Sequence, residues 1–231
     1  MTEKLRTTIV TGGTGALGSR VVRAFLEAGD RVVVPWIVER EHEAIASVEK
    51  SALAAGQLSL LRADVTQESG AASVASAAGE PSVLVNGVGG FAGGAPLHRT
   101  DLETWERMWT MNVRSAVAMS RAALPSMLAR RRGVILNVAS RAAIDRPAGL
   151  AAYSASKASV LVLTEVLQRE VASDGIRVNA IVPTTIDTPA NRAAMPKADF
   201  SQWTPPDRIA AVLLWLASDA GATVRGGFIP V

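Results

Sequence analysis

A glycine-rich turn near the start of the chain most strongly constrains what it can fold into. A strand-like run from Arg6 to Val10, rich in β-branched residues, precedes Thr11-Gly12-Gly13-Thr14-Gly15-Ala16-Leu17-Gly18, and a helical pattern follows from Ser19 to Ala28. The run predicts a strand, so the glycines form a turn between a strand and a helix. Glycines let a ligand approach the backbone, and a helix amino terminus offers free N–H groups and positive potential. The turn therefore predicts a phosphate site, although glycines also serve ordinary tight turns.

The rest of the chain alternates strand-like runs with helical patterns. Further strands are predicted at 31–36, 58–62, 82–85, 133–139, 176–182 and 227–231, and further helices at 39–55, 101–130, 154–173 and 206–218. This alternation predicts parallel βαβ units, and hence an α/β fold with a doubly wound parallel sheet and helices on both faces. With 231 residues, 48% of them apolar, the chain is long enough to bury one core, so residues 1–231 are predicted to form a single domain.

Tyr153 and Lys157 are candidate catalytic residues. Their spacing places both side chains on one face of a helix, one turn apart, and Tyr153 is the only tyrosine. A neighbouring ammonium lowers the pKa of a phenol, so the pair predicts proton exchange near neutral pH; a surface tyrosine stacked on a lysine stem is the alternative. Ser140 follows the predicted strand 133–139, at the sheet edge where ligands bind. Its hydroxyl can hold the oxygen that Tyr153 protonates, or it can begin a turn.

Taken together, these residues resemble the short-chain dehydrogenase/reductase family nearly from end to end. The resemblance implies a Rossmann-type fold, NAD(P) as cofactor and a catalytic set of Asn112, Ser140, Tyr153 and Lys157. It also implies that Lys157 holds the nicotinamide ribose and that Asn112 anchors a water leading protons to Lys157. Besides Tyr153 and Lys157, the cofactor contacts that it implies are Gly12, Thr14, Gly15, Ala16, Leu17, Gly18, Trp36, Asp64, Val65, Asn86, Gly87, Val88, Pro183, Thr185, Ile186 and Thr188.

Three segments resemble the dihydropteridine reductase branch of this family more narrowly. They are residues 15–20, 89–94 and 187–205, and that branch is dimeric and uses NADH. Ser140, however, is a feature of the wider family that this branch lacks. The predicted active site therefore resembles that of an ordinary carbonyl or alcohol dehydrogenase.

The predicted adenosine site departs from the family pattern. Ala16 stands where the commonest branch has glycine, and Trp36 ends the second strand where an acid would hold the ribose of NAD. Arg40 can pair with a 2′-phosphate, although Glu39 and Glu41 flank it and oppose that pairing. The sequence therefore leans slightly to NADP. Asp64 contacts the adenine amine in the family; the alternative is an Asx-turn into the next helix.

Composition narrows the remaining possibilities. The chain has no cysteine, and its two histidines lack partners at ligand spacing, so no metal site is predicted. The net charge is +3, and the run Arg130-Arg131-Arg132 ends a predicted helix, where cations complement the helix dipole, so nucleic-acid binding is not expected. No signal peptide or apolar stretch of transmembrane length is present. We therefore expect a cytoplasmic protein that does not bind membranes.

Two loops are expected to shape specificity for a small or flat substrate. Phe91 lies in the first, residues 87–98, and Trp203 ends the second, residues 184–203, which is a candidate lid. Arg141, beside Ser140, is the third candidate substrate residue. In the family, the helices around 105–128 and 154–171 pair between subunits, so the resemblance implies a homodimer or homotetramer.

Three functions stay open from the sequence. The first is NAD(P)-dependent hydride transfer to or from a small carbonyl or alcohol, which Ser140 favours. The second is reduction of quinonoid dihydropterin, which the segments 89–94 and 187–205 favour. The third is a dinucleotide-binding protein without catalysis, against which the complete set of Asn112, Ser140, Tyr153 and Lys157 speaks.

Overall fold

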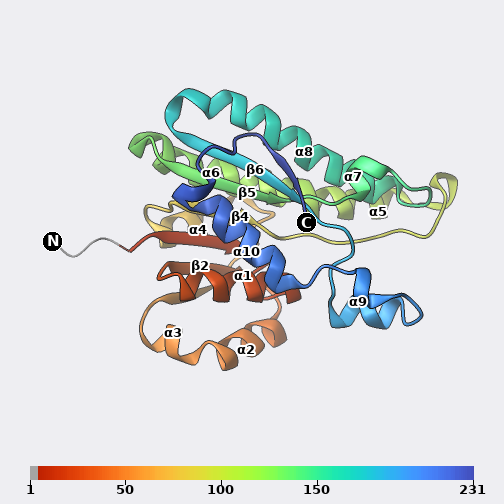
Figure 1. Cartoon of the computed structure of the whole chain (residues 1–231), viewed down its shortest axis with the longest axis horizontal. Coiled ribbons are helices and arrows are strands. Elements are labelled where there is room, and N and C mark those ends of the chain that lie inside the picture. Colours follow the sequence, from red (N-terminus) through yellow and green to blue (C-terminus); the bar gives the residue numbers. More distant parts are fainter. Residues whose placement is uncertain (1–4) are drawn as a thin grey trace.

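Seven parallel strands form one sheet at the centre of the protein, whose structure is a computed structural model that describes residues 5–231 (Figure 1). The order is β3-β2-β1-β4-β5-β6-β7. The strands are β1 (Thr7–Thr11), β2 (Arg31–Trp36), β3 (Leu58–Arg62), β4 (Val83–Asn86), β5 (Gly133–Val138), β6 (Ile176–Val182) and β7 (Phe228–Pro230). The order reverses beside β1, which pairs with both β2 and β4. The predicted doubly wound parallel sheet is therefore confirmed.

Helices cover both faces of this sheet. On one face lie α1 (Ala16–Glu27) and α10 (Pro206–Ala217), with α2 (Glu39–Val48) beside them (Figure 1). On the other face lie α4 (Glu68–Ala78), α6 (Ser115–Arg130) and α8 (Ala151–Val171). Successive strand residues alternate between the two cores: Val10 packs toward α1 and α10, whereas Ile9 packs toward α4, α6 and α8. Because helices cover both faces, the central strands β1, β4 and β6 are buried along their whole length.

Two of the predicted helices are divided in the structure. The predicted helix 39–55 breaks at Glu49 into α2 and α3 (Lys50–Ala54). The predicted helix 101–130 contains α5 (Leu102–Trp109), a π-helical turn η2 (Thr110–Arg114) and α6. Short helices that the prediction lacked are α7 (Ala142–Asp145), α9 (Pro189–Ala194), η1 (Leu97–Arg99), η3 (Ala172–Asp174), η4 (Phe200–Gln202) and η5 (Asp219–Gly221). Each is too short to carry a readable apolar period.

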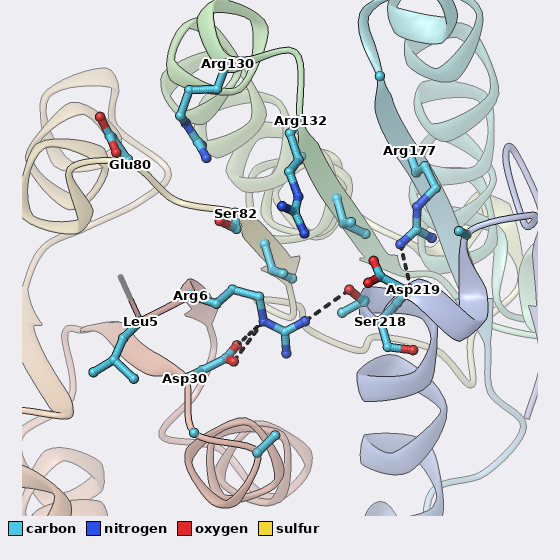
Figure 2. Close-up of a pocket in the computed structure, with 18 of the residues that line it drawn as sticks. Leu5, Arg6, Asp30, Glu80, Ser82, Arg130, Arg132, Arg177, Ser218 and Asp219 are labelled. Atoms are coloured by element: carbon cyan, nitrogen blue, oxygen red, sulfur yellow. Dashed lines mark hydrogen bonds and ion pairs between the residues drawn. The ribbon is translucent and has the colours of Figure 1, made fainter. Parts of the chain in front are cut away.

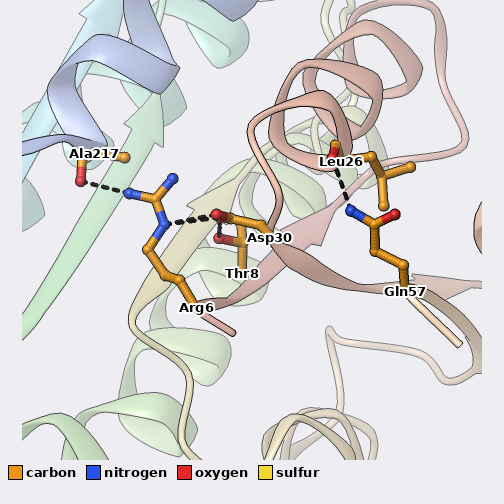
Figure 3. A network of polar contacts seen from close by, with 6 residues as sticks. All are labelled: Arg6, Thr8, Leu26, Asp30, Gln57 and Ala217. Atoms are coloured by element: carbon orange, nitrogen blue, oxygen red, sulfur yellow. Dashed lines mark hydrogen bonds and ion pairs between the residues drawn. The ribbon is translucent and has the colours of Figure 1, made fainter. Parts of the chain in front are cut away.

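An ion pair between half-buried Arg6 and buried Asp30 fastens two helices to the amino edge of the sheet (Figure 3). Asp30 follows α1, is only 2% exposed, and accepts hydrogen bonds from Thr8 and from Nε of Arg6, the latter at 2.8 Å. Arg6 also donates to the carbonyl oxygen of Ala217 at the end of α10, at 3.1 Å. The pair thus joins α1, β1 and α10.

No helix within residues 5–231 is long and apolar enough to cross a membrane. The same part of the chain holds no group of three or more histidine, aspartate or glutamate side chains that could bind a metal ion.

We expect the Asp30→Asn variant to lose about 2–3 kcal/mol of unfolding free energy, because the buried Asp30 carboxylate loses its charge-assisted hydrogen bonds from Arg6 and Thr8. Urea denaturation followed by circular dichroism measures this loss. The matched control is Asp174→Asn, which breaks the exposed pair between Asp174 and Arg131 and should cost no more than about 1 kcal/mol. Equal losses in the two variants would contradict the role given to Asp30.

Candidate active site

The carboxyl edge of the sheet gathers most of the predicted site residues. The glycine turn follows β1, Trp36 ends β2, Asn86 ends β4, and Ser140 and Pro183 come directly after β5 and β6. Tyr153 and Lys157 reach the same edge from the first turns of α8. The parallel topology thus brings together segments that are far apart in the sequence.

The glycine turn is packed so closely that side chains would block it. Gly12 has a φ of +66°, and a Cβ there would lie 2.7 Å from the carbonyl oxygen of Gly87. A Cβ on Gly18 would collide with the backbone of Gly12. Helix α1 begins at Ala16, and its N-cap residue, Gly15, supplies no side-chain hydrogen bond. The N–H groups of the first turn are therefore available to an anion, so the turn fits the pyrophosphate of a dinucleotide.

Lys157 is held at the end of β5. It is 5% exposed, and its Nζ donates to the carbonyl oxygen of Val138 at 2.8 Å. Burial lowers the pKa of Lys157 to about 8, because desolvation disfavours the ammonium. At pH 7 the side chain is therefore still protonated.

The pKa of Tyr153 shifts in the direction opposite to the one that the sequence predicted. Burial raises the pKa of Tyr153 above its ordinary value, and a hydrogen bond with the Ser140 side chain lowers it by less. The predicted lowering of this pKa by Lys157 is thus wrong for this structure. The four-residue spacing correctly places both residues on α8, but the Lys157 ammonium donates to the carbonyl oxygen of Val138. Burial is the largest influence on the pKa of the Tyr153 phenol.

Asn112 positions the loop after β4. It lies in the π-helical turn, is 2% exposed, and accepts a hydrogen bond from the N–H of Gly90 at 2.9 Å. Its amide donates to the Ser156 hydroxyl at 2.9 Å, which in turn donates to the carbonyl oxygen of Tyr153 at 2.8 Å. A Cβ on Gly89 would lie 2.8 Å from Oδ1 of Asn112 and 3.1 Å from Nζ of Lys157. Asn112 and Lys157 therefore meet at Gly89.

Sequence reasoning missed the link that Ser156 provides. The residue stands three positions after Tyr153 and one before Lys157, a place where a serine on a helix gives no signal of its own. Its role is visible only once α8 packs against the π-helical turn.

Asn86 is turned into the interior. Its amide nitrogen donates to Oδ1 of Asn137 at 2.9 Å and to the Ser120 hydroxyl at 3.2 Å, and Asn137 donates to Thr164 at 2.8 Å. This buried chain ties β4 to β5, α6 and α8. The buried Oδ1 of Asn86 has no hydrogen-bond partner, so it stays available as an acceptor.

The neighbouring glycine segment is fastened to β1. The Thr11 hydroxyl accepts hydrogen bonds from the N–H groups of Gly87 and Val88, at 3.0 and 3.3 Å. The predicted cofactor contacts in this segment therefore lie directly beside the glycine turn.

On the adenosine side, Trp36 is stacked on the protein itself. Its ring lies 4.2 Å from the ring of His42, and the Arg62 guanidinium lies 5.7 Å from the indole centre. The Thr14 hydroxyl donates to Oε2 of Glu41 at 2.7 Å. The sequence considered Glu41 only as a neighbour of Arg40, so this contact with the glycine turn was missed.

Asp64 and Val65 have structural roles in this structure. Asp64 accepts hydrogen bonds from the backbone N–H and the hydroxyl of Thr66, at 2.9 and 2.7 Å, which is the Asx-turn that was the alternative. Val65 is buried in the core beneath α4.

The predicted cofactor contacts after β6 lie in a segment that is held by hydrogen bonds within the protein. The N–H of Arg141 donates to the carbonyl oxygen of Pro183 at 2.8 Å, so the turns after β5 and β6 touch. Ile186 forms an isolated β-bridge with Thr204. The N–H of Thr204 donates to the carbonyl oxygen of Thr185 at 3.0 Å. The Thr188 hydroxyl caps α9.

Of the three candidate substrate residues, Phe91 has a ring contact with Tyr153. The two rings lie 5.0 Å apart, edge to face. The Arg141 side chain instead pairs with Asp145 at 2.9 Å. Trp203 packs on Phe200 with ring centres 4.7 Å apart, and the Arg192 guanidinium lies over the Phe200 ring. Phe91 is therefore the candidate that the structure brings to the phenol.

Comparisons with known proteins identify the family and the fold. A family profile described as short chain dehydrogenase matches residues 6–199. A 3-oxoacyl-acyl-carrier-protein reductase of rhamnolipid biosynthesis from Pseudomonas aeruginosa is 32% identical, covering 98% of this chain and 94% of the relative. An L-tagatose-forming galactitol 2-dehydrogenase from Cereibacter sphaeroides is 34% identical, covering 96% and 91%. The crystal structure of a metagenomic blue fluorescent protein in complex with NADPH is 26% identical and matches with a TM-score of 0.85, covering 98% and 96%.

The buried lysine makes stability depend on pH. In the unfolded chain Lys157 keeps its proton to about pH 10.4, whereas in the folded protein it releases the proton near pH 8. Because the unfolded state then binds more protons, the unfolding free energy should rise from pH 8 to 9.5 relative to a Lys157→Met variant, by at most about 1.4 kcal/mol per pH unit. Urea denaturation of both proteins at pH 7, 8, 9 and 9.5 measures the difference. A difference that does not change with pH would contradict the assignment.

Proposed function

The chain belongs to the short-chain dehydrogenase family, and on this premise we propose that it transfers a hydride between NAD(P) and a small carbonyl or alcohol substrate. It is an NAD(P)-dependent oxidoreductase of that family. Two contacts at the carboxyl edge of the sheet support the finer proposal: Ser140 hydrogen-bonds Tyr153, and Asn112 and Lys157 meet at Gly89. We further infer that residues 1–231 form a single dinucleotide-binding domain. A cytoplasmic location stays a prediction of the sequence.

Four side chains divide the work in this proposal. The nicotinamide cofactor, when bound, supplies or accepts the hydride. Tyr153 gives a proton to the substrate oxygen or takes one from it, and Ser140, which already contacts the phenol, orients that oxygen. Lys157 keeps a positive charge at the end of β5 and holds the nicotinamide ribose. Asn112 fixes the loop at Gly90 and anchors the water that leads protons to Lys157.

The substrate class is supported from two sides. The two relatives described above are named as a reductase and a dehydrogenase, so their names fit a carbonyl or alcohol at the reacting carbon. Phe91 packs against Tyr153 and also lines a cavity of about 450 Å³ that Arg99, Arg107 and Ala152 border. We propose that Phe91 covers one side of the substrate.

Reduction of quinonoid dihydropterin is the second candidate function. The segments 89–94 and 187–205 favour it through their resemblance to the dihydropteridine reductase branch. The contact between Ser140 and Tyr153 favours the carbonyl reaction. Reduction of a quinonoid dihydropterin, by contrast, needs little acid catalysis at an oxygen held by a serine. The complete set of four polar residues likewise speaks against a protein that only binds dinucleotides.

For the cofactor, the sequence leans slightly to NADP, but one contact favours NAD. An acid near the end of the second strand typically holds the ribose 2′-hydroxyl of NAD. Trp36 takes that position here, while Glu41 reaches the glycine turn from α2 through its bond to Thr14. A carboxylate beside this turn accepts from ribose hydroxyls and repels a 2′-phosphate. We therefore propose that Glu41 replaces the missing acid and that NAD(H) is preferred.

We also infer a homodimer or homotetramer. Apolar side chains are exposed on the helices that pair between subunits in the family: Trp109 on α5 is 54% exposed, and Val162 and Val166 on α8 are 60% and 44% exposed. A shared interface would cover them. Light scattering in solution tests the inference.

The Tyr153→Phe variant should keep cofactor binding near the wild-type level and lose roughly 10²–10⁴-fold in turnover, because only the proton-transferring hydroxyl is removed. Calorimetric titration with NADH and rates on a panel of small ketones and aldehydes give the two readouts. A Phe variant that turns over at the wild-type rate would refute the mechanism.

The Ser140→Ala variant separates the two candidate substrates. A carbonyl reductase should lose about 10- to 100-fold in turnover, since the substrate oxygen loses a hydrogen-bond partner. A dihydropterin reductase should change little. Rates with carbonyl substrates and with quinonoid dihydropterin, measured on wild type and variant, distinguish the reactions.

The Glu41→Gln variant should bind NADPH about 5- to 10-fold more tightly than wild type does, because a negative charge beside the 2′-phosphate is removed. Calorimetric titration of each cofactor measures this directly. Glu43→Gln, an exposed change on the same helix, is the control and should leave both affinities unchanged. If wild type binds NADPH more tightly than NADH, Glu41 is not the residue that selects the cofactor.

A further inference from the structure

An arginine-lined cavity opens at the amino edge of the sheet, opposite the candidate active site (Figure 2). It has a volume of about 800 Å³ and lies among the starts of β1, β4, β5 and β6 and the ends of α1, α6 and α10. The charged residues that line it are Arg6, Arg130, Arg132, Arg177, Arg225, Asp30, Glu80 and Asp219. Five arginines thus face three carboxylates, and the lining has an excess of positive charge.

Three of these arginines have structural partners. Arg6 pairs with Asp30, as described above. Arg130 donates to the carbonyl oxygens of Pro81 and Ser126, at 2.5 and 3.2 Å. Arg177, which is 8% exposed, donates to the carbonyl oxygens of Leu216, Gly221 and Ser218, at 2.7, 3.0 and 3.1 Å. These bonds satisfy carbonyl groups at helix ends and leave no need for a ligand.

Arg132 and Arg225 are different. Neither side chain makes a hydrogen bond or an ion pair within the described part of the chain. Figure 2 shows the Arg132 guanidinium pointing from the start of β5 into the space between Arg6 and Arg177. Burial lowers the pKa of Arg177; the nearby charge of Arg225 adds to this lowering, and Asp219 opposes it. Positive charges therefore gather around one space without an acid to match each of them.

We propose that this cavity binds a multivalent oxyanion, a small molecule with two or more phosphate or carboxylate groups, through Arg132 and Arg225. A guanidinium donates through a planar fork that matches both groups and is often bidentate. The bound anion would lie between Arg132, Arg225 and Arg177 and offset their repulsion. This site is separate from the glycine turn, which lies at the other edge of the sheet and itself attracts phosphate.

The test must therefore keep the two anion sites apart. Tripolyphosphate is titrated by calorimetry into the full chain, with and without saturating NADH, and citrate is titrated in parallel. We expect one tripolyphosphate site to persist with NADH present. Arg132→Gln should weaken it about 10- to 100-fold, the size expected for a lost charge-assisted hydrogen bond. Binding of tripolyphosphate but not citrate assigns phosphate groups; the reverse result assigns carboxylates.

Lys50→Gln, which removes one positive charge from the exposed start of α3, is the control and should leave the affinity unchanged. Thermal unfolding gives a second readout, because an anion that binds only the folded chain raises the unfolding midpoint in wild type but not in Arg132→Gln. Binding that NADH abolishes entirely would overturn the proposal, as would binding that Arg132→Gln leaves unchanged or that both variants weaken equally. If the chain binds no NADH, the titrations without it still decide between wild type and Arg132→Gln.

Discussion

The parallel direction of all seven strands is the constraint on which the rest of the structure depends. A chain that returns to the same edge before each new strand must place its crossover helices antiparallel to the strands. Helix amino termini then gather at the carboxyl edge, and helix carbonyl ends gather at the amino edge. Since each helix is positive at its amino end and negative at its carboxyl end, the two edges differ electrostatically before any side chain is chosen.

The residues at the two edges of the sheet match this electrostatic difference. At the carboxyl edge, Gly12 and Gly18 have no side chains that could cover the backbone N–H groups at the start of α1. At the amino edge, arginines supply donors to helix ends: Arg6 to α10, Arg31 to the last residues of α4, and Arg131 to Ser173 after α8. Arg6, Arg31 and Arg131 therefore have structural tasks, whereas Arg132 and Arg225 make no side-chain bond within the described residues.

The sequence predicted the sheet well because buried parallel strands are read from short apolar runs. The bounds of β2, β3 and β6 agree with the prediction, and the glycine turn and the four-residue spacing of Tyr153 and Lys157 depend on local geometry alone. Contacts between distant segments could not be predicted in this way. The bond between Thr14 and Glu41, the link from Asn112 through Ser156 to α8, and the stacking of Trp36 on His42 exist only because packing brings those segments together.

The protonation states of Tyr153 and Lys157 likewise follow from packing. Helical spacing indicates that an ammonium stands near a phenol, which alone lowers the pKa of the phenol. The fold buries both groups, and burial penalises both charged forms: it lowers the pKa of Lys157 to about 8 and raises the pKa of Tyr153. At pH 7 the pair therefore consists of an ammonium bonded to the Val138 carbonyl and a neutral phenol in contact with Ser140. A neutral phenol is a proton donor, so under the proposed mechanism Tyr153 is in the state needed for reduction of a carbonyl, whereas oxidation of an alcohol would first require the phenol to lose its proton.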